Sequence, residues 1–182
     1  MGVSKRKRIA LSKSAQSTDK TAQYVKQSDD LQLVSDNELI SLRARVETEM
    51  RRRNISFSVG DIGEQLVIDF FNSTPSLPNL LRAPRGTKNV DALSRNGDRY
   101  SIKTIWKGKK TGTVYPDSMI KNKQLFEYLL VVRLNDNWGL QSIFQIPWGK
   151  FVKIRSWDKR MNAWYLSCSS KNLTSMSLIS QQ

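Results

Sequence analysis

Residues 89–103 read NVDALSRNGDRYSIK, and they decide the fold because two strand-like runs flank a tight turn. The runs cover residues 89–94 and 99–106, and the turn RNGD lies at 95–98. Asn-Gly is a strong hairpin signal, since both residues tolerate a positive φ. The stretch therefore predicts a β-hairpin in which Asp91 lies across the ladder from Ser101 and Lys103.

Strand alternation indicates which of these side chains meet. Ser101 and Lys103 are two residues apart and share one face of a strand, whereas Ile102 points to the other. Carboxylate oxygens bind Mg²⁺, and a bound metal ion activates water and polarises a phosphate. A lysine beside it offsets charge in the transition state. The plain alternative is an Asp91 that caps a turn and a Lys103 that is an ordinary solvated strand residue.

Upstream of the hairpin, residues 60–72 show the apolar spacing of a helix. Asp61 lies in its first turn, where negative charge is favoured. Glu64 projects between apolar residues of the same face, and a carboxylate there is costly unless a positive group meets it. We therefore expect the Glu64 carboxylate to lie at the candidate site of Asp91 and Lys103. The alternative is a boundary residue that extends to solvent.

Around these segments the pattern predicts an α/β domain with a mixed sheet covered by helices. Further strands are expected over 80–83, 128–134 and 139–146, and a loop rich in Gly and Lys over 107–116. A short helix is expected over 118–126. Residues 171–182 predict a flexible C-terminus.

The N-terminal part predicts two further segments. Residues 1–34 are rich in Ser, Thr, Gln and Lys and predict a disordered basic tail. Ser35 to Glu38 has the form of a capping box and predicts an accessory helix within 35–55. Its apolar stripe is narrow, so the helix is expected to pack on the domain from outside or to pair with another subunit, which makes a homodimer possible.

Composition restricts the chemistry. The net charge is +14, an excess that attracts polyanions, and nucleic acid is preferred over a membrane because no basic amphipathic helix is apparent. The chain has no histidine, which excludes Ser-His-Asp and Cys-His catalysis and histidine zinc sites. The single cysteine, Cys168, suits a reducing compartment. With no secretory signal and no apolar run of about 20 residues, a cytoplasmic protein is expected.

The hairpin over residues 89–103 and the helix before it resemble those of the PD-(D/E)xK, restriction-endonuclease-like superfamily. Asp91 matches the aspartate at the start of the family's hairpin, Lys103 matches its lysine, and Glu64 matches a glutamate that many members carry on the preceding helix. The similarity covers about residues 58–152. It implies a restriction-endonuclease-like core over 56–170, with a central mixed β-sheet flanked by helices. It also implies a Mg²⁺-dependent DNA endonuclease of a restriction or defence system.

In the family pattern, the resemblance implies that Asp91, Glu64 and Ile102 hold the metal. One position departs from that pattern. Ser101 stands where the family usually has a second acid, and serine is a weak, neutral metal ligand. Glu64, or with less support Glu127, then takes over that role. Otherwise the chain is a catalytically degenerate nucleic-acid-binding protein on the same fold.

Basic residues around the hairpin are candidates for contacts to DNA phosphates, which give affinity without sequence information. Each of them is also compatible with an ordinary solvated surface. A basic structural or ribosome-associated protein would need no active site and remains a third alternative. The DNA-binding candidates are Arg85, Lys88, Lys107, Lys109, Lys110, Lys121 and Lys123.

Overall fold

The computed structural model describes residues 31–55, 58–84, 86–120 and 122–181. The chain divides into two compact units, Met1–Ile55 and Ser56–Gln182. Most of the predicted N-terminal tail and two DNA-binding candidates, Arg85 and Lys121, lie outside the described residues. No helix within the described ranges is long and apolar enough to cross a membrane.

In the first unit, a 3₁₀ turn over Leu31–Leu33 precedes helix α2, Asp36–Arg52. The predicted capping box is confirmed, because the Ser35 N–H and hydroxyl both donate to Glu38 Oε2, at 3.0 and 2.7 Å. No residue of α2 is buried. Its apolar stripe is therefore uncovered within the described part of this unit.

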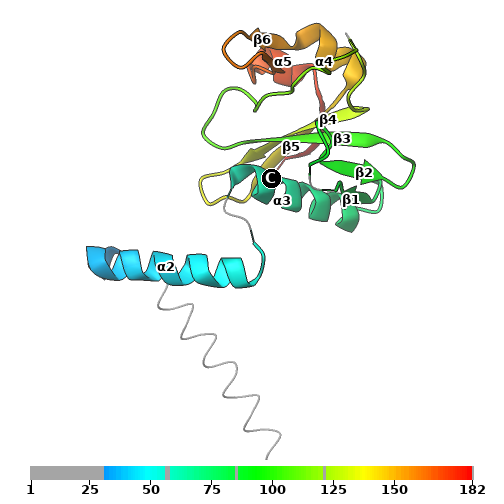
Figure 1. Cartoon of the computed structure of the whole chain (residues 1–182). Helices are drawn as coiled ribbons and strands as arrows, with labels where there is room; N and C mark the ends of the chain where they lie inside the picture. Colours follow the sequence, from blue (N-terminus) through cyan, green and yellow to red (C-terminus); the bar gives the residue numbers. More distant parts are fainter. Residues whose placement is uncertain (1–30, 56–57, 85, 121, 182) are drawn as a thin grey trace, which may run out of the picture. The chain divides into compact units, whose positions relative to one another are not determined.

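The second unit is an α/β domain with a six-stranded mixed sheet packed against helices (Figure 1). The strand order is β1-β2-β3-β4-β5-β8, in which β3 and β4 are parallel and every other neighbouring pair is antiparallel. The expected α/β class with a mixed sheet is confirmed. The strands are β1 Leu80–Arg82, β2 Ala92–Ser94, β3 Arg99–Ile105, β4 Tyr128–Leu134, β5 Leu140–Pro147 and β8 Ser177–Gln181.

Helix α3, Val59–Ser73, covers one face of this sheet (Figure 1). Its N-terminus is capped by the Ser58 hydroxyl, which accepts a hydrogen bond from Asp61 N at 3.0 Å. Val67 and Phe71 are fully buried in a cluster that includes Ile102 of β3. The helix therefore lies against the strand that carries Ser101 and Lys103.

The opposite face is covered by smaller elements and a second apolar cluster (Figure 1). These are α4 Trp148–Ile154, α5 Ser170–Thr174 and the hairpin of β6 Ser156–Asp158 and β7 Ala163–Tyr165. The predicted loop over 107–116 is fixed to this layer: Thr111 N donates to Leu166 O at 2.9 Å, and Val114 N to Trp164 O at 2.8 Å. It therefore packs as part of the domain.

Three local predictions need correction. The helix expected over 118–126 is wrong for its described residues, which form bends and turns instead. Asp117 accepts hydrogen bonds from Met119 N and Ile120 N, and such side-chain contacts compete with helix formation. In the hairpin turn Gly97 has a positive φ of 87° but Asn96 does not, because Ser94 and Asp98 are joined by a loop of three residues in which the glycine comes last.

The C-terminal segment also differs from the expectation of a flexible end over 171–182. It contains part of α5 and strand β8, and β8 pairs with β5 at the edge of the sheet. Its register includes Phe144 opposite Leu178 and is interrupted by a bulge. Backbone pairing along a sheet edge orders this segment.

Candidate active site

The candidate site lies where β2 and β3 separate. β2 pairs with β3 only at Arg99 and Tyr100, and Asp91 N extends the ladder by donating to Tyr100 O at 2.8 Å. Beyond this point the edge of β3 that faced β2 is open. The Asp91 side chain turns onto that edge and takes the place of a strand partner.

One carboxylate oxygen of Asp91 accepts three hydrogen bonds. Asp91 Oδ2 receives Ile102 N at 2.6 Å, Ser101 Oγ at 3.2 Å and Lys103 Nζ at 3.3 Å. The side chains of Lys103 and Asp91 are 18% and 20% exposed, so they face solvent without being freely solvated. Oδ1 accepts no hydrogen bond from any residue that the structure describes. Asp91 is thus held through one oxygen and open at the other.

Glu64 reaches the same place because α3 approaches β3 closely. A Cβ atom on Gly63 would overlap the Thr104 side chain, so only glycine allows this packing. Thr104 Oγ1 also donates to Gly60 O at 3.5 Å. Glu64 follows Gly63 and is thereby carried to the open edge.

The electrostatics of Glu64 agree with that position. Burial raises the pKa of Glu64, and the negative charge of Asp91 raises it further, while Arg82 and Lys103 act in the opposite direction. Arg82 Nη1 donates to Glu64 Oε2 at 3.0 Å, and Oε1 accepts no hydrogen bond from the described residues. Glu64 and Asp91 therefore form an interacting acidic pair with one free oxygen each.

These oxygens suit a hard divalent cation. The N–H and C=O of one strand residue point to the same side, and Ile102 N points to Asp91, so the Ile102 carbonyl also faces the open edge. Two carboxylates and one carbonyl are the ligand types Mg²⁺ takes, with water and phosphate completing its shell. Among the described residues no group of three or more His, Cys, Asp and Glu side chains could hold a metal ion. A metal would therefore depend on the backbone and on substrate.

Two other candidates have defined structural places. Ser101 is fully buried, and its hydroxyl donates to Asp91, so in this geometry it orients the carboxylate. Glu127 accepts Arg99 N, Nε and Nη2 at 2.7, 3.0 and 2.8 Å. These bonds hold the pKa of Glu127 below its usual range. Its carboxylate is fully engaged at the start of β3 and is not joined to Asp91.

Three of the described basic candidates are each paired with a different acid. Lys107 Nζ lies 3.7 Å from Asp136 Oδ1, Lys110 Nζ 3.8 Å from Asp158 Oδ2, and Lys123 Nζ 2.9 Å from Asp117 Oδ2. Lys88 and Lys109 are exposed and form no ion pair with a described residue. These two lysines are therefore the described candidates left for contact with an anionic partner.

Sequence reasoning did not single out Arg82 or Asn89. The register places Arg82 opposite Ala92, next to Asp91, which brings its guanidinium to Glu64. Strand β1 has only three residues, and so short a segment does not predict the contact between Arg82 and Glu64. Asn89 accepts Tyr115 N at 3.2 Å and donates to Tyr115 O at 3.0 Å, a link over 26 residues that the local pattern does not reveal.

Neither a scan against protein-family models nor a search of curated proteins finds a match. The functional argument therefore depends on the residues and their geometry.

Proposed function

We propose that this chain is a Mg²⁺-dependent DNA endonuclease with a restriction-endonuclease-like core, acting in a restriction or defence system. The observation that carries the proposal is the state of Asp91. Three donors hold its Oδ2, while Oδ1 accepts no hydrogen bond from a described residue, and the Asp91 charge acts on Glu64. An acidic pair of this kind, together with a lysine, can support metal-dependent hydrolysis of a phosphodiester.

Each residue has a role in this proposal. The carboxylates of Asp91 and Glu64 and the carbonyl of Ile102 would hold Mg²⁺, which would supply a Lewis acid for the phosphate and a bound water of lowered pKa. The Lys103 ammonium orients the attacking water and offsets charge that develops on the phosphate. Ser101 keeps Asp91 in position.

The charge of the chain supports DNA as the partner. A net charge of +14 favours binding to a polyanion, and Lys88 and Lys109, which form no ion pair with a described residue, are suited to phosphate contacts. One site breaks one strand, so cutting of both strands calls for two chains. The uncovered stripe of α2, with Leu39, Leu42 and Val46 exposed, is compatible with a homodimer. The single cysteine suits a reducing compartment such as the cytoplasm.

A second function is favoured by a different observation. Ser101 replaces the usual second acid, and Arg82 already pairs with Glu64. Both features weaken a metal site. The alternative is a non-catalytic protein on the same fold that binds nucleic acid through its charge, with salt-sensitive affinity.

Plasmid cleavage distinguishes the two. Purified protein is incubated with supercoiled plasmid in Mg²⁺, in Mn²⁺ and in EDTA. We expect nicked or linear product only with metal, and its loss in Asp91→Ala and in Lys103→Ala. Lys171→Ala, which removes an exposed charge in α5, is the matched control. Cutting that survives both site variants contradicts the site, and binding in EDTA with no product in either metal supports the alternative.

A further inference from the structure

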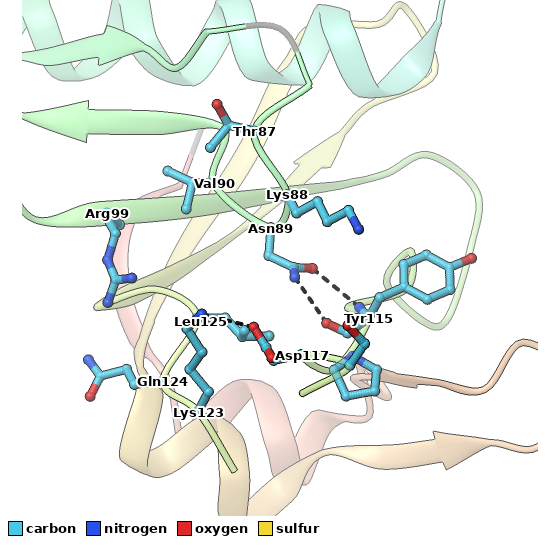
Figure 2. Close-up of a pocket in the computed structure, with 12 residues that line it drawn as sticks. Thr87, Lys88, Asn89, Val90, Arg99, Tyr115, Asp117, Lys123, Gln124 and Leu125 are labelled. Atoms are coloured by element: carbon cyan, nitrogen blue, oxygen red, sulfur yellow. Dashed lines mark hydrogen bonds and ion pairs between the residues drawn. The ribbon is translucent and has the colours of Figure 1, made fainter. Parts of the chain in front are cut away.

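A pocket of about 700 Å³ lies beside the candidate active site. Its walls are the segment before β2 and the segment that leads to β4, and the paired hydrogen bonds between Asn89 and the Tyr115 backbone join the two (Figure 2). Its volume falls in the range of sites for small molecules, about 300–1,000 Å³. Its lining residues are Thr87, Lys88, Asn89, Val90, Arg99, Tyr115, Pro116, Asp117, Ser118, Lys123, Gln124 and Leu125.

The chain places this pocket next to Asp91. Asn89 and Val90 line it and directly precede Asp91. On β3, Arg99 lines it and shares a strand face with Ser101 and Lys103. A molecule in the pocket therefore lies alongside the strand that carries the proposed catalytic lysine.

The charged groups of the pocket are unequally paired. Lys123 donates to Asp117, and this contact with two backbone N–H groups holds the pKa of Asp117 well below its usual range. Arg99 is paired with Glu127. Lys88 forms no ion pair with a described residue, so it is the cation available to a bound anion.

The remaining surface is suited to a flat, partly apolar group. The Tyr115 side chain is 48% exposed, while Val90 and Leu125 are buried and give the pocket an apolar floor. Figure 2 shows Lys88 and Tyr115 at one end of the pocket and Arg99 and Gln124 at the other. An exposed ring beside an unpaired lysine combines base stacking with phosphate binding.

We propose that this pocket binds one unstacked nucleotide of the DNA strand, next to the phosphate that is cleaved. Its base stacks on the exposed Tyr115 ring, and its phosphate contacts Lys88. That the bound nucleotide lies next to a cleaved phosphate rests on the proposed nuclease function. The substrate is then a strand with an unpaired nucleotide, such as a single strand, a frayed end or a gap.

Binding measured in EDTA tests the pocket without cleavage. The probe is a fluorescein-labelled single-stranded deoxyoligonucleotide of about 12 nucleotides, within the site sizes of single-strand binding proteins. It is compared with its blunt, fully paired duplex by anisotropy at fixed salt. We expect Tyr115→Ala and Lys88→Ala to weaken single-strand binding by about tenfold, with a smaller change for the duplex. Tyr115→Phe keeps the ring and retains affinity, and Lys171→Ala is the charge-matched control.

The outcomes separate the two proposals. Equal single-strand affinity of Tyr115→Ala and wild type overturns the pocket, whether or not the plasmid is cut. A loss in Lys171→Ala equal to that in Lys88→Ala also overturns it, because the effect is then one of overall charge. Selective loss with no plasmid cleavage supports the pocket and contradicts only the nuclease. Tight binding of dAMP, with no effect of the variants on the oligonucleotide, identifies a free nucleotide and overturns a strand ligand.

Discussion

The two ends of β3 each bring an acid to a base, and they do so in different ways. At the start of the strand, Glu127 receives the Arg99 backbone and two guanidinium nitrogens at 2.7–3.0 Å, divided between both carboxylate oxygens. Farther along, Asp91 receives all its donors on Oδ2, and Glu64 is paired through Oε2 alone. Both oxygens of Glu127 accept hydrogen bonds, whereas Asp91 and Glu64 each have one oxygen that accepts none from the described residues.

The pKa shifts follow this difference. Hydrogen bonds from Arg99 lower the pKa of Glu127, which is typical of a structural ion pair. Burial and the negative charge of Asp91 raise the pKa of Glu64. The positive charges of Arg82 and Lys103 lower it, but they do not offset this rise. A divalent cation would supply more positive charge. The comparison therefore separates Glu127, whose carboxylate is paired on both oxygens, from Asp91 and Glu64, which are the proposed metal ligands.

The largest effect is expected from Gly63→Ala, which disturbs the approach of α3 to the open end. The added methyl group overlaps Thr104, and overpacking of this kind costs about 1–3 kcal/mol in the free energy of unfolding. Urea denaturation measures it. Gly60→Ala is the control on the same helix, because its Cβ would meet only Ser58 Oγ, at 3.7 Å. Equal stability of the two variants would show that Gly63 does not set the position of Glu64.

A smaller loss is expected from Glu127→Gln at the closed end. Both side chains of that ion pair are about one-third exposed, and solvent screening limits the cost to about 1 kcal/mol. Urea denaturation with and without Mg²⁺ measures it. We expect the same loss in both conditions, since Glu127 is not joined to Asp91. If Mg²⁺ stabilised the wild type but not Glu127→Gln, Glu127 would contribute to metal binding, and the distinction between the two ends of β3 would be wrong.

The smallest effect is the pH dependence of Glu64→Gln in EDTA. A carboxyl whose pKa is raised by folding binds more protons when folded, so its contribution to stability falls as pH rises from its ordinary pKa through the raised one. Below that window the two proteins should be similar, because protonated Glu resembles Gln. Above it the variant should gain relative to wild type. Urea unfolding across the acid and neutral range tests this, and a gap that is constant or shrinks with rising pH contradicts the raised pKa.

Much of this comparison was accessible from the sequence. Asn-Gly between two strand-like runs predicted the hairpin, and alternation placed Ser101 and Lys103 on one face of β3, as the structure has them. The helical spacing around Glu64 predicted α3. These are local patterns with periods of 2 or 3.6 residues, which a single sequence reveals.

Features that depend on distant pairing were not accessible. Strand β8 is ordered by β5, more than 30 residues earlier, and Arg82 meets Glu64 only through the register of β1. The helix expected over 118–126 was wrong because Asp117 binds the backbone that a helix would need. The sequence also did not predict that one oxygen of Asp91 lacks a described donor, because this depends on the residue at which β2 stops pairing with β3.

Binding of Mn²⁺, measured by electron paramagnetic resonance in the absence of DNA, tests the central claim most directly. Wild-type protein and Glu127→Gln should bind the ion with the same affinity. Asp91→Asn should bind it at least about tenfold more weakly, because it removes a charged ligand and leaves the fold intact. Equal Mn²⁺ affinity in wild type and Asp91→Asn would contradict a metal site at the open end of β3.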